Sequence, residues 1–241
     1  MGRIHNIEGK KNKMDSLRSN VFTKHARAIS VAARQGGGNP DYNAALKLAI
    51  QKAKADNMPN DNINRAIKKG TGEDGGANYE QITYEGYGPS GSAVIVYALT
   101  DNKNRTASDV RHLFDKCGGS LGATGCVSYL FTRKGVIYIS KSTSFSDDDI
   151  MMTALECGAN DVEIDEDVYV VYTDPDNLDS VKEAIEANSI TVDQALVDMI
   201  PQNYVTMPED KMNSFNRLID GLEDNDDVQE VYHNVDLPDE E

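Results

Sequence analysis

The sequence predicts an α+β protein: an N-terminal three-helix domain followed by two α/β domains, of which the third is ferredoxin-like and inserted into the second. Apolar residues recur at helical spacing over residues 21–70, after a basic arm, and alternate as in strands from residue 79 onward. The length of 241 residues also exceeds one typical domain. We place the helical domain at 1–75, the second domain at 79–133 plus 201–241, and the third at 134–200.

Three helices are expected in the first domain. Residues 21–35 contain neither Gly nor Pro and form the first helix. The next three residues, GGG, end it, and Asn39 with Pro40 suits the N-cap and first position of a second helix. Pro59 opens a third helix, which stops at Gly70.

Strands begin at Tyr79. Residues 92–100 are apolar on both faces, which is typical of a central strand covered on both sides. A helix that stops at Gly118 comes next, and residues 127–131 are predicted to form a further strand.

The third domain shows the order strand, helix, strand, strand, helix, strand. This βαββαβ order is the ferredoxin-like split unit. The helix and strand after this unit need a sheet to join, so the unit is predicted to interrupt the second domain. The six predicted elements are 135–140, 146–157, 161–164, 168–172, 175–188 and 191–200.

Charge is distributed unevenly along the chain. The net charge is −16, yet residues 1–70 hold 14 Lys and Arg against 5 Asp and Glu, and residues 71–241 hold 10 against 35. Such asymmetry points toward a nucleic-acid partner for the first domain, whereas a basic surface without a polyanion partner is the alternative. The predicted nucleic-acid-binding residues are Lys10, Lys11, Lys13, Arg18, Lys24, Arg27, Arg34, Lys47, Lys54, Lys68, Lys69 and Tyr87.

Lys24, Arg27 and Arg34 fall within an arc of roughly 80° on the first helix, at about 100° per residue. They are therefore expected to be surface positions that neutralise phosphates.

The stretch GYGPSG at residues 86–91 matches the dinucleotide fingerprint G-x-G-x-x-G letter by letter. That fingerprint requires a helix after the glycines, because the helix N-terminus holds the pyrophosphate. Here a strand comes after them, so we predict a hairpin connection and no cofactor site. Tyr87 either stacks on a nucleobase from this connection or folds back onto the sheet.

No catalytic, metal or cofactor site is predicted. The three cysteines form no CxxC pair and the histidines are scattered, which favours reduced thiols in a cytoplasmic protein. No apolar run approaches the roughly 18 residues of a membrane span. The cysteines and histidines are Cys117, Cys126, Cys157, His5, His25, His112 and His233.

Two acidic runs have structural interpretations. Ser146 followed by three aspartates predicts an N-cap with a favourable first helical turn. Residues 224–227 lack the glycine and terminal glutamate of a calcium loop, and are expected to form a solvated turn.

Three blocks of sequence resemble the YebC family of bacterial regulatory proteins: FTKHARAISVAARQGGGNPDYNAALKLAIQKAKADNMPNDNINRAIKKGTG, YEGYGPSG and TDNKNRTASDVRHLFDKCGGSLG. The resemblance covers nearly the whole chain. It implies a three-domain protein without known catalytic activity, a probable transcriptional regulator that binds DNA. A mitochondrial relative is a translational activator for cytochrome oxidase, and bacterial members are implicated in helping ribosomes through difficult sequences. The family start resembles GHSKWxNIxHRK, whereas this chain has GRIHNIEGKKNK and no Trp.

Two classes of function remain at this point. One is a nucleic-acid-binding regulator or ribosome-associated factor, with promoter DNA or ribosomal RNA as target and a monomer as the expected state. The other is a small-ligand sensor or an enzyme that uses the ferredoxin-like domains.

Overall fold

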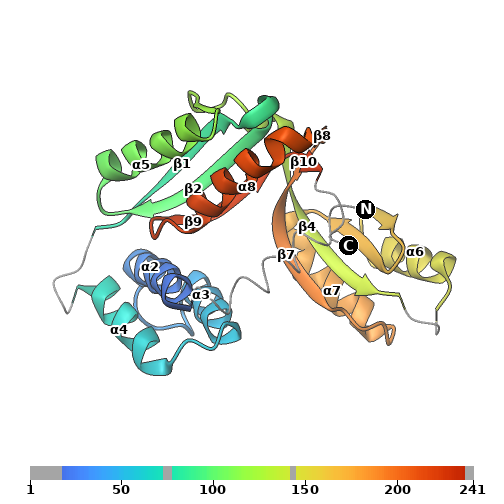
Figure 1. Cartoon of the computed structure of the whole chain (residues 1–241). Helices are drawn as coiled ribbons and strands as arrows, with labels where there is room; N and C mark the ends of the chain where they lie inside the picture. Colours follow the sequence, from blue (N-terminus) through green and yellow to red (C-terminus); the bar gives the residue numbers. More distant parts are fainter. Residues whose placement is uncertain (1–17, 73–77, 142–144, 237–241) are drawn as a thin grey trace. The chain divides into compact units, whose positions relative to one another are not determined.

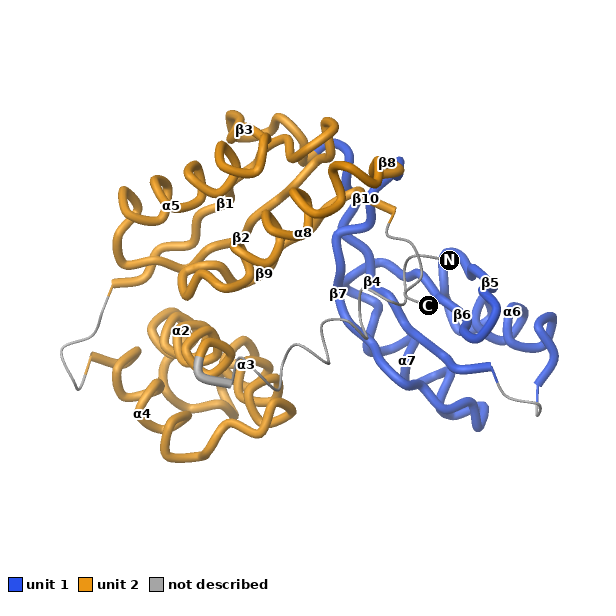
Figure 2. The backbone as a smooth tube through the Cα atoms, in the orientation of Figure 1, with its two compact units in different colours: residues 1, 129–204, 241 blue, residues 2–128, 205–240 orange. Residues whose placement is uncertain are grey.

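The computed structural model describes residues 18–72, 78–141 and 145–236 (Figure 1). The chain forms two compact units, one of which spans 129–204, while the other comprises the residues before and after it (Figure 2). The inserted unit therefore interrupts the other in sequence. Helices, two four-stranded sheets and a two-stranded sheet in the described residues make this an α+β protein, as predicted.

The N-terminal helices are α2 (Arg18–Gly36), α3 (Ala44–Ala55) and α4 (Asn60–Thr71). Helix α2 packs against both others around a core that includes Ile29, Leu46 and Ile63. Gly70 allows α4 to approach α2 closely, because a Cβ there would lie 2.3 Å from the carbonyl oxygen of Ser30. The Ser30 hydroxyl in turn donates to a carbonyl of α4.

The start of α3 differs from the prediction. Asn43, not Asn39, is the N-cap, and its side-chain oxygen accepts a hydrogen bond of 3.0 Å from the backbone N–H of Leu46. Its amide nitrogen donates to the carbonyls of Ala32 and Gly37, each at 2.8 Å. Because Asn43 is buried and satisfies groups on both sides of the loop, it displaces the exposed Asn39 as the cap.

A four-stranded sheet with the order β3-β1-β2-β9 comes after the helices. Phe114, Leu218 and Leu222 of α5 and α8 pack in one cluster with apolar residues of the sheet. The central strand β2 is almost wholly buried, as expected. The elements are β1 (Glu80–Tyr87), β2 (Ala93–Thr100), α5 (Lys103–Lys116), β3 (Ser120–Leu121), α8 (Glu209–Glu223) and β9 (Val228–His233); β8 (Val205–Thr206) and β10 (Val235–Asp236) pair in parallel.

The GYGPSG stretch is a hairpin connection, as predicted. Tyr87 at the end of β1 pairs with Ala93 at the start of β2, and the short 3-10 helix η1 (Pro89–Gly91) lies between them. Strand β2, and not an α-helix, comes after the glycines, so no α-helix N-terminus begins at this connection.

The strand predicted at 127–131 is wrong. These residues form a turn and the 3-10 helix η2 (Ser128–Leu130), and the next strand begins at Phe131. The buried carboxylate of Glu85 accepts hydrogen bonds from the backbone N–H groups of Gly125, Val127 and Ser128. These N–H groups therefore have acceptors without a neighbouring strand. Burial raises the pKa of Glu85, but these hydrogen bonds outweigh it and hold the pKa below its usual value.

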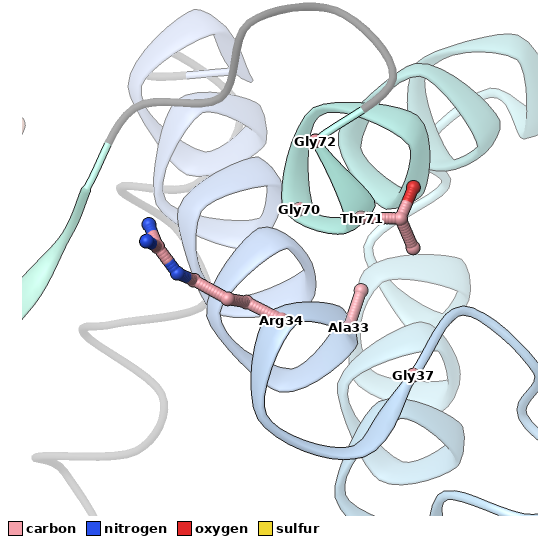
Figure 3. A pocket seen from close by; sticks show the side chains of 6 residues that line it. All are labelled: Ala33, Arg34, Gly37, Gly70, Thr71 and Gly72. Atoms are coloured by element: carbon pink, nitrogen blue, oxygen red, sulfur yellow. The ribbon is translucent and has the colours of Figure 1, made fainter.

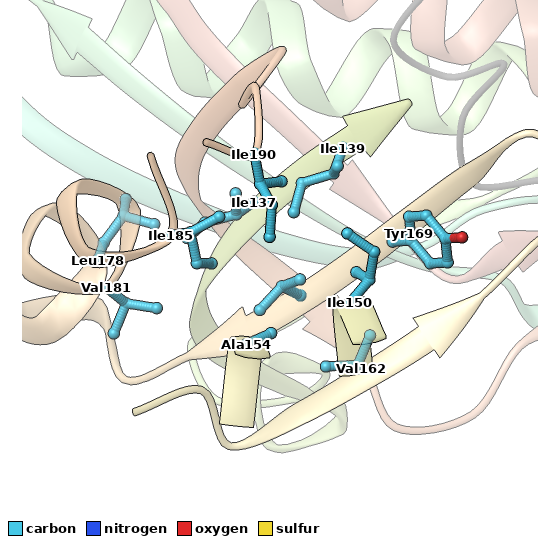
Figure 4. Packing of buried hydrophobic residues seen from close by; sticks show 11 residues of the cluster. Ile137, Ile139, Ile150, Ala154, Val162, Tyr169, Leu178, Val181, Ile185 and Ile190 are labelled. Carbon is cyan, nitrogen blue, oxygen red and sulfur yellow. The ribbon is translucent and has the colours of Figure 1, made fainter. Parts of the chain in front are cut away.

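The inserted unit has the ferredoxin-like order predicted, with the antiparallel sheet β5-β6-β4-β7. Ile137 and Ile139 of β4 pack with Ile150 and Ile185, which lie in the two helices of the inserted unit (Figure 4). Ser146 is the N-cap of the first helix, as expected, and it also forms a capping box with Asp149. The elements are β4 (Phe131–Ser140), α6 (Asp147–Glu156), β5 (Asp161–Ile164), β6 (Val168–Thr173), η3 (Pro175–Asn177), α7 (Leu178–Ala187) and β7 (Gln194–Pro201).

Candidate nucleic-acid interface

The predicted cations of the helical domain fall into two groups by exposure. Lys24 and Arg27 on α2 are partly buried. The exposed group is Arg34, Lys47, Lys54, Lys68 and Lys69, together with Lys52 and Arg65, which were not among the residues predicted from the sequence. Lys10, Lys11 and Lys13 and the side chain of Arg18 lie outside the described residues.

Arg27 is held by protein groups. Its guanidinium forms an ion pair with the carboxylate of Asp227 and donates a hydrogen bond of 3.2 Å to the carbonyl of Leu99. The guanidinium also lies 5.6 Å from the centre of the Tyr79 ring. Only 14% of the Arg27 side chain is exposed, so it offers little surface to a phosphate.

Asp227 is the centre of this network. Its buried carboxylate accepts hydrogen bonds from Arg105 at 2.8 and 3.0 Å and from the hydroxyl of Thr106 at 2.7 Å. Burial raises the pKa of Asp227, but the hydrogen bonds from Arg105, Thr106 and Arg27 outweigh it and hold the pKa below its usual value. The carboxylate is therefore ionised at neutral pH.

The expected solvated turn at 224–227 is thus wrong at Asp227. Two of its partners, Arg27 and Arg105, are 200 and 122 positions away in the sequence. An isolated acidic run is hydrophilic and is usually exposed, and no local pattern reveals a partner at that distance.

Lys24 is engaged in the same region. Its ammonium donates a hydrogen bond of 2.6 Å to the carbonyl of Glu223, at the end of α8. Burial lowers the pKa of Lys24, and the nearby carboxylates of Glu223, Asp224 and Asp226 oppose that shift. We call Lys24, Arg27 and Asp227 the α2 latch.

The expectation that Lys24 and Arg27 are surface positions is therefore wrong. Helical spacing correctly places them on one face of α2, but it does not say whether that face meets water or protein. The latch gives these charges partners within the protein, which compensates for part of their desolvation.

Helices α3 and α4 present their cations outward. Helix α3 contains no acidic residue, and at about 100° per residue Lys47 and Lys54 lie on one side of its solvent face, with Lys52 on the other. Arg65 and Lys68 lie opposite the buried face of α4. This spacing is visible in the sequence and would have identified Lys52 and Arg65.

Lys69 is exposed on α4 but has a protein partner. Its ammonium donates to the hydroxyl of Tyr79 at 3.0 Å and lies 5.4 Å from the centre of that ring. Of the predicted cations on α3 and α4, it is the one for which a hydrogen bond to another part of the described chain is seen.

Two tyrosines, the predicted Tyr87 and Tyr42, differ in exposure. Tyr87 is 37% exposed, and its hydroxyl donates a hydrogen bond of 2.9 Å to the carbonyl of Cys126, so the side chain is anchored to the protein. Tyr42, which was not predicted from the sequence, is 88% exposed. It lies in the loop before α3, the helix that carries the exposed Lys47, Lys52 and Lys54.

A pocket of about 400 Å³ lies between the ends of α2 and α4. Figure 3 shows its lining, with the Arg34 side chain extending away from Thr71. The lining holds no carboxylate, imidazole or thiol, so it offers no general acid or base. Across the described part of the chain, no three His, Cys, Asp or Glu residues gather as a metal site would require, and no helix is both long and apolar enough to span a membrane.

Two family models match this chain. One, described as the TACO1/YebC protein N-terminal domain, matches residues 2–73, and the other, described as the TACO1/YebC second and third domain, matches residues 79–235. The chain belongs to the TACO1/YebC family. The resemblance found in the sequence is thereby confirmed.

Relatives of this TACO1/YebC protein have been given a regulatory name. A protein of Caldanaerobacter subterraneus subsp. tengcongensis is 52% identical over 235 residues, covering 98% of this chain and 97% of the relative. A protein of Clostridioides difficile is 54% identical over 235 residues, covering 97% and 98%. Both are named probable transcriptional regulatory proteins, which supports a regulatory role for the family.

A solved structure shares the fold. The crystal structure of a conserved hypothetical protein from Aquifex aeolicus superimposes with a TM-score of 0.78 at 46% identity, covering 94% of this chain and 93% of that one. The α+β fold class predicted from the sequence is therefore confirmed for this TACO1/YebC protein.

Proposed function

We propose that this TACO1/YebC protein is a non-enzymatic regulator of gene expression that binds nucleic acid through the outward faces of α3 and α4. The observation that carries the proposal is the charge on these two helices. Their exposed side chains include six cations and one carboxylate, that of Asp61. The cations are Lys47, Lys52, Lys54, Arg65, Lys68 and Lys69.

The mode of binding can be inferred from the residue types. Lysine and arginine neutralise phosphates, which gives affinity but little sequence information. If about five phosphates are neutralised, the logarithm of affinity falls with the logarithm of salt concentration at a slope of about −4 to −5. We expect a preference of about tenfold to a hundredfold for any DNA sequence, below the roughly thousandfold lower range of specific regulators.

The inserted unit bears on the identity of the target. Residues 129–204 hold 4 Lys and Arg against 16 Asp and Glu, so phosphates would repel this unit. A basic domain joined to an acidic one suits a particle of RNA and protein, such as a ribosome, better than a bare duplex. At physiological salt, ribosomes should compete at least as well as any promoter fragment. A promoter fragment bound a thousandfold more tightly than scrambled DNA, without ribosome association, would restore the specific DNA regulator.

The test of the interface is a charge reversal on the two helices. The triple variant Lys47→Glu, Lys54→Glu, Lys68→Glu should weaken binding of a 20-nucleotide RNA at least a hundredfold, since three phosphate contacts become repulsive. These side chains are exposed, so the melting temperature should change little.

A matched control separates a local interface from net charge. The triple variant Lys116→Glu, Lys211→Glu, Arg217→Glu changes the net charge equally at exposed positions outside the helical domain. It should bind within about threefold of the wild type, because the substituted charges lie outside the proposed contact surface. Equal losses from the two variants would contradict an interface on α3 and α4.

A further inference from the structure

Tyr42 is the most exposed large hydrophobic side chain in the described part of the chain, at 88%. It precedes α3, whose outward face carries a second exposed apolar side chain, Leu48, at 55%. Single exposed apolar residues are common, but these two belong to one short segment that also carries exposed lysines.

The backbone around Tyr42 is fixed from both sides. Its N–H donates to the carbonyl of Asn39 at 3.2 Å, closing a turn. The next residue, Asn43, is buried and joins the end of α2 to the start of α3 through hydrogen bonds to Ala32, Gly37 and Leu46. The ring is therefore presented from a rigid loop, which lowers the entropy lost when a partner contacts it.

The charge around the ring selects a class of partner. Lys47 lies about one turn into α3, and Lys52 flanks Leu48 on the outward face. Helix α3 has no carboxylate to oppose a phosphate, and the exposed Asp41 directly precedes Tyr42 in the sequence. An exposed aromatic ring and exposed lysines within one segment are the combination with which proteins bind unpaired nucleotides, since the base stacks while the backbone is neutralised.

We propose that Tyr42 is a stacking platform for an unpaired nucleobase, with Lys47 and Lys52 contacting the flanking phosphates. Bases inside a duplex already stack on both faces, so the ring selects single-stranded segments, loops and bulges. This inference rests on the proposed function and specifies it: the ligand is an unpaired stretch of RNA or DNA.

The chain itself offers a reporter, because it contains no Trp. The variant Tyr42→Trp places a single indole at the proposed platform. Its fluorescence should be quenched when a uridine 20-mer or a thymidine 20-mer is added, and should change little with a 20-base-pair duplex. The control Tyr129→Trp, at another exposed tyrosine in the inserted unit, should respond to none of the three. An unquenched indole at position 42 under saturating oligonucleotide would overturn the proposal.

Affinities provide the second measurement. Tyr42→Ala should weaken binding of the two single strands about 5-fold to 100-fold, as expected for the loss of one stacked base, and should leave duplex binding within about twofold. Tyr42→Phe keeps the ring and should bind within about twofold of the wild type. The salt slope should be the same in all three proteins, because no cation is changed.

The outcomes separate this inference from the proposed function. If Tyr42→Ala binds single strands as the wild type does, while Lys47→Glu, Lys54→Glu, Lys68→Glu loses them, the platform is wrong and the basic interface stands. If the wild type binds neither single strands nor duplex, both proposals fail. A stronger loss for RNA than for DNA supports the platform and identifies RNA as the ligand.

Discussion

Helix α2 and the pair α3 and α4 carry the same kinds of cation at helical spacing, yet the cations have different surroundings. On α2, the Lys24 ammonium donates a hydrogen bond to the carbonyl of Glu223. The Arg27 guanidinium donates to the carbonyl of Leu99 and pairs with the carboxylate of Asp227, and both cations are partly buried. On α3 and α4, Lys47 and Lys68 are exposed. The net charge of a helical domain therefore overstates its capacity for a polyanion, because part of that charge serves internal contacts.

The physical cost of the two arrangements also differs. A partly buried cation loses hydration, and hydrogen bonds and an opposite charge within the protein must offset that free-energy cost. An exposed lysine keeps its hydration and contributes little to stability. Substitutions of the partly buried Lys24 and Arg27 on α2 should consequently change folding stability, whereas substitutions of the exposed lysines on α3 and α4 should change binding.

The largest effect should come from the centre of the α2 latch. Asp227→Ala leaves Arg27 without its carboxylate partner in a shielded position and should lower the free energy of unfolding by about 3–5 kcal/mol. Urea unfolding followed by circular dichroism measures this. The exposed neighbour Asp226→Ala is the control and should change stability by less than about 0.5 kcal/mol. Similar values for the two variants would show that the latch contributes nothing.

A smaller loss is expected for Arg27→Ala. Asp227 keeps its hydrogen bonds to Arg105 and Thr106 in this variant, so we expect a loss of about 1–3 kcal/mol, typical of a hydrogen bond to a charged group. Arg34→Ala, at an exposed position of the same helix, should cost less than about 0.5 kcal/mol. Thermal melting of both variants compares them, and an equal loss would remove the distinction between buried and exposed cations on α2.

Lowering the pH should remove the stability that the ionised Asp227 contributes. The folded-state pKa of Asp227 lies below its unfolded value of about 3.9, so its ionisation stabilises the fold fully above that pH. This contribution is lost as the pH falls through the folded-state pKa. The stability difference between wild type and Asp227→Asn should therefore be constant above about pH 5 and shrink below about pH 4. A difference that stays constant down to about pH 2 would contradict an ionised Asp227.

The smallest effect concerns the salt dependence of binding. Lys47→Met removes one proposed phosphate contact and should make the salt slope for single-stranded RNA shallower by about 0.7. Lys24→Met keeps the stem of a latch residue and should leave the slope unchanged, even if it alters stability. Titrations of RNA over a series of salt concentrations measure both slopes. A shallower slope for Lys24→Met would place α2 in the interface and erase the contrast with α3.

Much of the architecture was accessible from local pattern. The helical and strand periodicities located the βαββαβ unit and the hairpin at GYGPSG, and the strand after the glycines of that hairpin distinguishes them from a cofactor fingerprint. The capping box at Ser146 was equally predictable, since both of its partners lie within three residues. Such features depend on neighbours in the sequence, which is why they can be predicted.

The errors share the opposite property. The N-cap of α3 is Asn43 and not Asn39, because the Asn43 side chain also donates a hydrogen bond to Ala32 in α2. The strand predicted near Val127 is absent, because the carboxylate of Glu85 accepts the hydrogen bond of the Val127 N–H. The role of Tyr87 in binding stays a prediction. We propose Tyr42 as the stacking residue because its ring is far more exposed.

The family, the α+β class, the order of most elements and the basic character of the helical domain follow from the sequence alone, because each is encoded in residues close together or in composition. Which cations are exposed to water depends on the packing of the whole chain. Arg27 and Asp227 are 200 positions apart, and their pairing depends on the path of the whole chain between them. Charge type is a property of a residue, whereas exposure and pairing are properties of the packed fold.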